Sequence, residues 1–286
     1  MWLNHILFVR VTLMIFDVNG EYGYELFAAL PLINWYHEAG HDVIVKSAKG
    51  AGLLYPNIRV DEIYKSREPF LRLHIDNQEY YRQHNHVAGC FSRPIVGDKL
   101  MWEDKWSPPN LKEHYKGMFQ MFFDKPIVVV SNKYQMEWNG NPVNYLDIST
   151  LSRIFEILSD KFYIVYNRPG LTDIVNDHST QLTFGDRDLV FQSGITTMQD
   201  LAEEYNLDYN TTQMLVMSRA NHHISTQGGN SALAAYFGGE NIIYGIKGYE
   251  VKWNAYETFF PKLSGQTIHH VTSYDELINK VKTYVK

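Results

Sequence analysis

The amino-acid sequence predicts an α/β protein made of two halves, each with a parallel sheet, that face each other across a cleft. A buried strand followed by a polar loop and a helix occurs twice, once from Ile6 and once from Ile127. In the first copy the helix leads into another strand, which is the order that joins parallel strands. The length of 286 residues fits one large domain or two of ordinary size.

The first half begins with the strand predicted over Ile6–Phe16, which is rich in β-branched and aromatic residues. Tyr24–Ala39 has apolar residues at helical spacing and Pro31 inside it, so we expect a kink or a restart at the proline. Gly40 suits the position after a helix. His41–Ser47 is the next predicted strand.

The segment before the boundary between the halves has weaker patterns of hydrophobic residues. Ile58–Lys65 predicts a strand, whereas Phe70–Arg93 shows no clean period. Ser107–Pro109 is a break, and Asn110–Phe123 is compatible with a helix. We place the boundary between the halves after residue 123, which gives domains over 1–123 and 124–286.

The second half restarts with the apolar run Ile127–Ser131. Asp147–Asp160 predicts an amphipathic helix, and Ser273–Tyr284 predicts a last helix that opens with a capping box and can pack back on the first half. The other predicted strands are 162–166, 188–191, 222–226, 241–246 and 267–271, and the other predicted helices are 197–205, 211–219 and 231–237.

Composition narrows the class of protein. Hydrophobic residues make up 45% and charged residues 20% of the chain, which supports a globular core. The net charge of −6 argues against binding of nucleic acid through a basic face. Cys90 is the sole cysteine, so no intrachain disulfide forms. The apolar start, Leu3–Phe16, is too short and too interrupted by polar residues for a membrane span. We therefore expect a cytoplasmic protein.

The stretch HHISTQGGNSALAAYFGG, from His222 to Gly239, places a polar loop between a predicted strand and an Ala-rich helix. Gly228 and Gly229 let a ligand approach the backbone, and the start of the helix offers free N–H groups that suit a phosphate. It matches neither a Walker sequence nor the dinucleotide fingerprint. The alternative is a tight turn with an ordinary helix cap. The loop residues with polar side chains are Ser225, Thr226, Gln227 and Asn230.

Two cations also follow predicted strands of the second half. Lys133, after Asn132, is a point charge suited to a phosphate, and Arg168 could pair in bidentate fashion with a diphosphate. Because ligands of open α/β sheets bind at the carboxyl ends of the strands, we expect both cations on the rim that holds Gly228. The alternative is that each is a solvated surface charge.

The first half has its own glycine loop at the end of its first strand, with Gly20 and Gly23 on either side of Glu21. A carboxylate there could act as general base toward an attacking hydroxyl. The competing interpretation is that Glu21 only complements the start of the helix. Asp17 is the second candidate base.

The sequence does not predict a metal site. Histidines pair closely at 84 and 86, 222 and 223, and 269 and 270, but none has the spacing of a zinc motif. No DxD triplet and no GxSxG elbow occur. We expect no cofactor and no essential metal.

These features together resemble the GT-B glycosyltransferases, in particular the heptosyltransferase-like and fucosyltransferase-like branches. The matching parts are the glycine loop Asn19–Gly23, the pair Asn132–Lys133 and the loop Ser225–Asn230. The glutamate that the family usually carries on the following helix is absent, since Ala234 and Ala235 occupy that helix. The resemblance implies two Rossmann-like domains, with the acceptor on the side of residues 1–123 and the nucleotide-sugar held by 124–286.

The resemblance also implies an activity: transfer of a hexosyl or pentosyl group from a nucleotide-sugar to a hydroxyl of a glycan or other acceptor, without metal and with inversion. Lys133, Arg168 and the Gly228 loop would neutralise the leaving diphosphate. Gln227 or Asn230 would contact the ribose or the donor sugar, and Glu21 would deprotonate the acceptor. A nucleotide-sugar epimerase and a non-catalytic nucleotide- or carbohydrate-binding protein are the alternatives.

Overall fold

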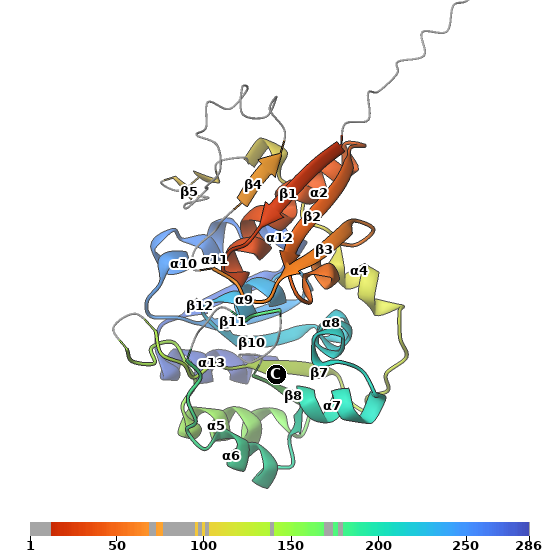
Figure 1. The fold of residues 1–286 in the computed structure, drawn as a ribbon. Coiled ribbons are helices and arrows are strands. Elements are labelled where there is room, and N and C mark those ends of the chain that lie inside the picture. Colours follow the sequence, from red (N-terminus) through yellow and green to blue (C-terminus); the bar gives the residue numbers. More distant parts are fainter. Residues whose placement is uncertain are drawn as a thin grey trace, which may run out of the picture.

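A computed structural model of the protein describes residues 13–68, 73–76, 95–96, 99–100, 103–137, 140–168, 174–176 and 180–285. Two sheets organise the fold, one of four strands in the order β3-β2-β1-β4 and one of six in the order β12-β11-β10-β7-β8-β9. Figure 1 shows the first sheet and its helices above the second. The predicted α/β class with two sheets is confirmed.

The first sheet comprises β1 (Leu13–Val18), β2 (Asp42–Ala48), β3 (Arg59–Tyr64) and β4 (Leu73–Asp76). β1, β2 and β3 are parallel, and β4 runs antiparallel to β1. β4 was not predicted, because this four-residue strand lies in the stretch without a clean hydrophobic period. The part of the first predicted strand before residue 13 lies outside the described residues.

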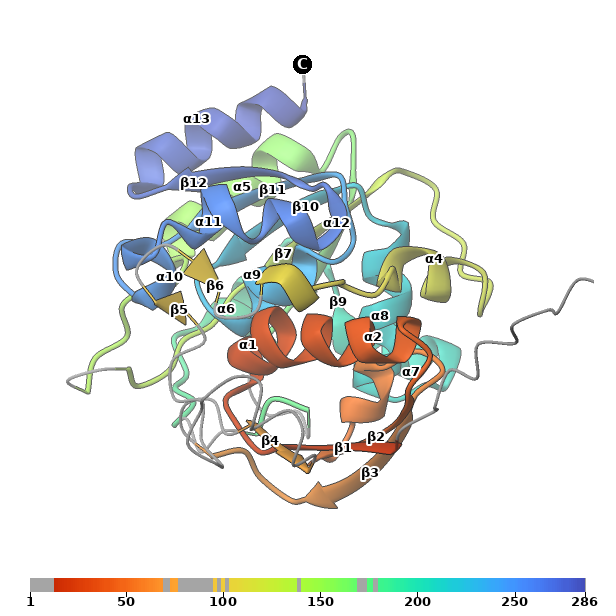
Figure 2. The same cartoon turned by 90° about the horizontal axis from the view of Figure 1, so that it is seen from above.

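One continuous helical run follows β1 and covers a face of its sheet (Figure 2). It consists of α1 (Tyr22–Tyr24), the π-helix η1 (Glu25–Ala29) and α2 (Leu30–Glu38). Pro31 has no N–H to donate to Phe27 O, and Trp106 Nε1 donates to that carbonyl instead, at 3.1 Å. The helix therefore widens into a π-turn before the proline rather than breaking. Gly40, at φ +87°, follows its end as predicted.

Between the last strand of the first sheet and the first strand of the second, the described residues form the hairpin strands β5 (Ile95–Val96) and β6 (Lys99–Leu100), η3 (Glu103–Lys105) and α4 (Leu111–Lys116). The short helix η2 (Ala51–Leu54) comes earlier, between β2 and β3. The helix predicted over 110–123 is thus much shorter. Asn110 caps its start by accepting from Glu113 N, and Gly117 ends it.

The second sheet is wholly parallel. Its strands are β7 (Ile127–Ser131), β8 (Tyr163–Asn167), β9 (Thr196–Thr197), β10 (His222–Thr226), β11 (Glu240–Tyr244) and β12 (Thr267–Val271). The chain starts at β7, moves outward to β9, then returns to place β10 on the other side of β7. This reversal creates a topological switch point between β7 and β10, where open α/β sheets bind ligands.

The helices of the second half are α5 (Ile148–Leu158), α6 (Asp186–Gln192), α7 (Met198–Tyr205), α8 (Tyr209–Arg219), α9 (Gly229–Ala234), α10 (Tyr249–Lys252), α11 (Ala255–Thr258), α12 (Pro261–Ser264) and α13 (Tyr274–Tyr284). The predicted strand 188–191 is wrong, since these residues lie in α6. Gly185 at φ +80° starts that helix, and Val190 is the buried residue of its inner face.

The last helix, α13, packs on the second sheet beside α5 (Figure 1). Its buried residues Leu277, Ile278 and Val281 share an apolar cluster with Val128 and Val130 of β7. Among the described residues, the apolar stripe of α13 is therefore buried on the second sheet.

The two halves share a core. The larger apolar cluster contains Phe16 and Leu26 from the first half and Leu233 and Phe237 from the second. α1 and η1 lie against α9, so the helices that follow the two glycine loops meet directly. Within the described part of the chain, no helix is long and apolar enough to cross a membrane.

Candidate active site

The loops after β7 and β10 meet at the switch point. Lys133 Nζ donates to Gln227 Oε1 at 3.3 Å, and a Cβ built on Gly228 would lie 3.4 Å from the same Nζ. The ammonium group therefore lies next to the glycine backbone, as the predicted anion site requires. Lys133 also forms an ion pair with Glu137, whose side chain is 6% exposed.

The two glycines of this loop are needed for different reasons. Gly228 has φ +122°, a conformation that side-chain-bearing residues rarely adopt. Gly229 lies against the other half, because a Cβ there would fall 2.7 Å from Tyr22 Cδ1. Gly23 faces the same spot, with an added Cβ 3.6 Å from Gly229 Cα. The two glycine loops thus form the contact between the halves.

Gln227 is 4% exposed and connects several segments beside Lys133. Its Oε1 accepts from Asn144 Nδ2 at 2.8 Å, and its Nε2 donates to Glu250 Oε2 at 2.5 Å. Asn144 in turn accepts from Ile246 N at 2.9 Å. These bonds fix the amide beside Lys133. Neither Asn144 nor Glu250 stood out in the sequence, since Asn144 lies in an irregular loop and Glu250 in the four-residue helix α10.

Other predicted donor-binding residues have protein partners. Ser225 Oγ donates to Asn241 Oδ1 at 3.0 Å inside the sheet. Asn132 bonds both backbone groups of Leu146, at 3.0 and 2.8 Å, and accepts from Lys133 N at 2.9 Å. The structure therefore places Ser225 and Asn132 as supports of the loops.

Two more residues of the glycine loop differ in exposure. Thr226 is fully buried, and its Oγ1 has no hydrogen-bond partner within the described ranges. Asn230 is half-buried in the first turn of α9, a helix of six residues. Ser231 Oγ donates to Gly228 O at 2.8 Å and so fixes the carbonyl that precedes the helix.

Arg168 points to a different place from Lys133. Its Nη1 contacts both oxygens of the buried Asp186, at 2.7 and 2.9 Å, and its guanidinium carbon lies 5.2 Å from the ring centre of Phe184. Arg168 Nη2 lies 3.5 Å from Tyr134 O. The loop after β7 therefore has Lys133 toward Gly228 and Arg168 on its other side, with the charge of Arg168 balanced by Asp186.

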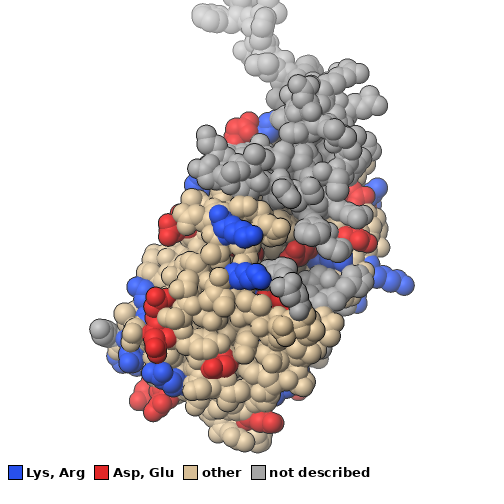
Figure 3. Space-filling view, turned by 90° about the vertical axis from the view of Figure 1, so that its left-hand side faces the viewer, with Lys and Arg blue, Asp and Glu red and all other residues tan. Residues whose placement is uncertain are grey.

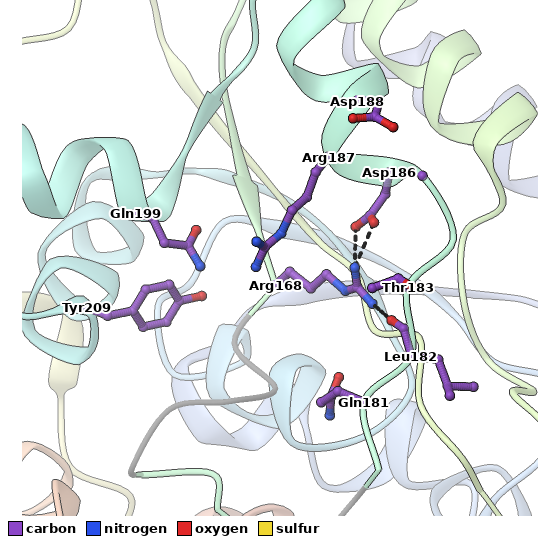
Figure 4. Close-up of a pocket in the computed structure, with 10 residues that line it drawn as sticks. Arg168, Gln181, Leu182, Thr183, Asp186, Arg187, Asp188, Gln199 and Tyr209 are labelled. Atoms are coloured by element: carbon purple, nitrogen blue, oxygen red, sulfur yellow. Dashed lines mark hydrogen bonds and ion pairs between the residues drawn. The ribbon is translucent and has the colours of Figure 1, made fainter.

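Arg168 lines a cavity of about 660 Å³ at the carboxyl ends of β8 and β9. Figure 4 shows Arg187 reaching into this cavity, with Gln199 and Tyr209 on the opposite side from Asp186. Tyr209 OH donates to Asn167 Oδ1, and burial raises the pKa of Tyr209 well above its usual value. The cavity thus combines an aromatic ring, amides and guanidinium groups.

A second, smaller cavity lies between the halves. Glu21, Gly23, Tyr24 and Phe27 line it from the first half, and Gln227, Tyr249, Glu250 and Trp253 line it from the second. The rings of Tyr249 and Trp253 stack at 5.1 Å with an angle of 25°. Its volume of about 60 Å³ holds water but not a sugar ring. The halves are therefore closed on each other at this point.

The two candidate bases occupy different positions. Glu21 lines the cavity between the halves, next to Gln227. Asp17 lies in β1, where Tyr64 OH donates to its Oδ1 at 2.5 Å. Burial and this bond raise the pKa of Tyr64 to about 12, so the phenol stays protonated and keeps its bond to Asp17. Of the two carboxylates, the structure brings Glu21 to the glycine loop of the other half.

A buried ion pair beside this site was missed from the sequence. Glu25 and Arg67 are both fully buried and contact each other. Ser47 Oγ and Tyr55 OH donate to Glu25 Oε1 at 2.9 and 2.6 Å. One available signal was the position of Glu25, which follows the glycine loop in a helix whose other residues are almost all apolar.

The described residues contain no cluster of three or more potential metal ligands. His84, His86 and Cys90 lie outside them. His222 packs between Phe162 and Tyr284, with ring centres at 5.1 and 4.4 Å, and His223 is buried in the sheet. Figure 3 shows one face of the molecule, on which basic and acidic side chains alternate rather than form a broad basic surface.

The second sheet has the strand order of a Rossmann fold, and a smaller α/β half with its own glycine loop faces it. Two solved structures of glycosyltransferases are similar over almost the whole chain, which confirms the resemblance seen in the sequence at the level of fold. The structure of E. coli ADP-heptose lps heptosyltransferase II is similar over 96% of this chain and 99% of its own, with 8% identity and a TM-score of 0.53. The glycosyl transferase family 9 structure from Veillonella parvula matches over 97% of this chain and 90% of its own, with 8% identity and a TM-score of 0.55. No protein-family model and no curated protein matches the chain.

Proposed function

We propose that the protein transfers a sugar from a nucleotide-sugar to a hydroxyl of a glycan or other acceptor, in the cytoplasm, with residues 1–123 on the acceptor side and 124–286 on the donor side. One observation carries the proposal. At the switch point of a GT-B sheet, Lys133 lies beside Gly228, and the adjoining cavity is lined by Glu21 from the opposite half. A cation for the leaving group and a carboxylate for the acceptor thus come from facing halves.

Lys133 and the Gly228 loop serve the leaving group. As the bond from the anomeric carbon to the diphosphate breaks, negative charge develops on the leaving oxygen, and a fixed cation there lowers the barrier. The absence of a side chain at Gly228 lets phosphate oxygens approach the ammonium group. Glu137 and Gln227 hold Lys133 in the free protein, and the diphosphate joins them as a further partner of the ammonium group on binding. This arrangement supplies the positive charge without a metal.

Glu21 serves the acceptor. It takes the proton of the attacking hydroxyl, whose oxygen forms the new bond to the anomeric carbon as the diphosphate departs from the opposite side. Attack from the face opposite to the leaving group inverts the configuration. The stacked rings of Tyr249 and Trp253 offer apolar faces on which a sugar ring can pack.

The nucleoside of the donor occupies the cavity beside Arg168. Its volume of about 660 Å³ is in the range of small-molecule sites. Tyr209 provides a ring face for the base, while Gln181 and Gln199 offer amide donors and acceptors. In this proposal one extended nucleotide passes the loop of Lys133 and Tyr134, since Lys133 lies beside Gly228 and Tyr134 beside Arg168.

A thermal-shift screen against nucleoside diphosphates and nucleotide-sugars tests the proposal. A ligand that binds only the folded state raises its apparent stability by mass action, by about 2.7 kcal/mol at a hundred times its Kd. Stabilisation by at least one of these compounds is expected, and a flat response to all would contradict the proposal. Incubating the active compound with enzyme alone then separates the activities. An epimerase forms an isomeric nucleotide-sugar, whereas a transferase needs the acceptor.

A further inference from the structure

Arg67 contacts both halves of the molecule from a fully buried position just after β3. In the first half, its Nη1 donates to Gly20 O at 3.1 Å, within the loop that carries Glu21. In the second, its Nε donates to Ile174 O at 2.6 Å and its backbone N donates to Asn176 O at 2.7 Å. One residue therefore bonds the candidate base loop and a segment more than a hundred positions later.

The connection to the second half involves more than one side chain. Asn176 Nδ2 donates back to Lys65 O at 3.0 Å, which gives a reciprocal pair of bonds between residues 65–67 and 174–176. Residues 174–176 belong to the stretch between Arg168 and Gln181, both of which line the larger cavity. Arg67 thus links the loop of Glu21 to the chain around the proposed nucleoside site.

Arg67 also supports the contact of the two glycine loops. Its guanidinium carbon lies 5.2 Å from the ring centre of Tyr22. Gly229 is a further neighbour of this ring, since an added Cβ there would meet Tyr22 Cδ1 at 2.7 Å. Tyr22 is therefore held between a first-half cation and the backbone of the second-half anion loop.

Glu25 keeps the guanidinium in place. It pairs with Arg67 Nη1 and is itself oriented by Ser47 and Tyr55. Removing both charges from water is expensive, so a buried pair of this kind adds little net stability. Arg67 Nη2 and Tyr22 OH are buried without a hydrogen-bond partner among the residues that the structure describes, which makes the cluster less favourable still. An apolar cluster in place of Arg67 and Glu25 could supply as much stability. It could not make the hydrogen bonds that connect Gly20 to residues 174–176.

We propose that Arg67, held by Glu25, is a positioning residue that locks the two halves closed and so sets the separation of the Glu21 loop from the Gly228–Gly229 loop. The lock is a property of the fold, but its importance for turnover rests on the proposed glycosyl transfer. The cavity between the halves holds only water in the closed arrangement, so entry of a sugar requires the halves to separate. Arg67 then releases Ile174 and Asn176 and stays with Gly20 and Glu25.

The distance between the halves in solution tests the lock without any substrate. Spin labels are attached at Ile63→Cys and Phe191→Cys, which are 54% and 86% exposed in the first and second halves, in a Cys90→Ser background. Pulsed electron paramagnetic resonance gives the distance distribution of the full chain. The test variants are Arg67→Lys, which keeps the charge opposite Glu25, and the neutral double variant Arg67→Met/Glu25→Gln. Lys112→Met is the control, because Lys112 also joins the halves, through Asn221 Oδ1 at 2.8 Å, but away from the site.

The parent protein and Lys112→Met are expected to give one narrow distribution, and both Arg67 variants to gain a longer distance while keeping the circular dichroism of the parent. If the Arg67 variants are folded and give the same distance distribution as the parent, Arg67 does not lock the halves closed. If no nucleotide binds the parent, the proposed function fails, yet the distance distributions still decide whether Arg67 holds the halves together.

Discussion

Lys133 Nζ lies 3.3 Å from Gln227 Oε1, a bond that joins the loops after the two strands on either side of the switch point. Parallel strands that are neighbours in the sheet but distant in the chain bring these residues together. The amide oxygen and Glu137 share the ammonium group, so the cation is held at the glycine loop before any ligand arrives. Fixed charge of this kind needs little rearrangement in the transition state.

Loss of this cation should slow transfer strongly. We expect Lys133→Ala/Glu137→Gln to lower kcat by a factor of about 100 to 1,000, the range for removal of one fixed group that stabilises developing charge. The second substitution prevents Glu137 from remaining as a buried unpaired carboxylate. Steady-state kinetics with the identified donor measure the effect. Lys125→Ala is the matched control, because Lys125 contacts only Ser159 O on the surface among the bonds described for it. Equal rates in the parent and the double variant would remove Lys133 from the leaving-group site.

Substitution of Glu21 and of Asp17 should have different effects on kcat and so show which of them is the general base. We expect Glu21→Gln to reduce kcat by about 100- to 10,000-fold with donor affinity unchanged, since general base catalysis contributes in that range. Asp17→Asn keeps an acceptor for Tyr64 OH and should change kcat by less than about tenfold, the ratio that 1.4 kcal/mol represents. The reverse ranking would assign the base to Asp17 instead.

The nucleoside cavity makes its own prediction. Arg187 and Gln199 reach into it from α6 and α7, and among the described residues neither side chain has a bond like the one that holds Arg168 to Asp186 (Figure 4). Alanine at either position should weaken nucleoside diphosphate binding by about 0.5–1.5 kcal/mol, the usual contribution of one hydrogen bond. Calorimetric titration measures this. Arg153→Ala, on the exposed side of α5, is the control. Unchanged affinity in Arg187→Ala/Gln199→Ala would move the nucleoside out of this cavity.

Acid should destabilise the protein through His223. Burial lowers the pKa of this imidazole to about 3, whereas the unfolded chain has a pKa near 6.5. Between these values the unfolded state binds a proton that the folded state does not, so the free energy of unfolding falls as pH drops from about 6.5 toward 3, by up to about 1.4 kcal/mol per pH unit. Denaturation in urea across this range measures the slope. His223→Leu should reduce it, and an identical slope in this variant would show that His223 does not control the acid response.

The sequence predicted most of the second sheet because four of its strands, such as Ile127–Ser131, are runs of almost wholly buried residues. The prediction was wrong where the local hydrophobic pattern of a segment differs from the structure that the segment has in the folded chain. Residues 188–191 look like a strand in isolation, but Gly185 and the acidic first turn make them part of a helix. Lys133, Gly228 and Glu21 were predicted to lie in the loops after strands, and the structure has them there. Glu25 and Arg67 were not predicted as site residues, because only the folded chain brings these positions, 42 residues apart, into contact.

The contact of the two glycine loops allows a test by paired substitution. A Cβ at Gly229 would lie 2.7 Å from Tyr22 Cδ1, far inside normal contact, whereas a Cβ at Gly23 meets nothing closer than 3.6 Å. Gly229→Ala should therefore destabilise the protein by about 1–3 kcal/mol, the usual effect of overpacking, and weaken nucleotide binding, while Gly23→Ala changes both less.

Removing the opposing ring should relieve the clash. In Gly229→Ala/Tyr22→Ala the loss is expected to be smaller than the sum of the two single losses by at least about 0.5 kcal/mol, as for residues in direct contact. Unfolding in urea of the parent, the two single variants and the double variant measures this coupling. Strict additivity would mean that the halves do not meet through Tyr22 and Gly229 in solution, and the closed arrangement of the two glycine loops would then have to be abandoned.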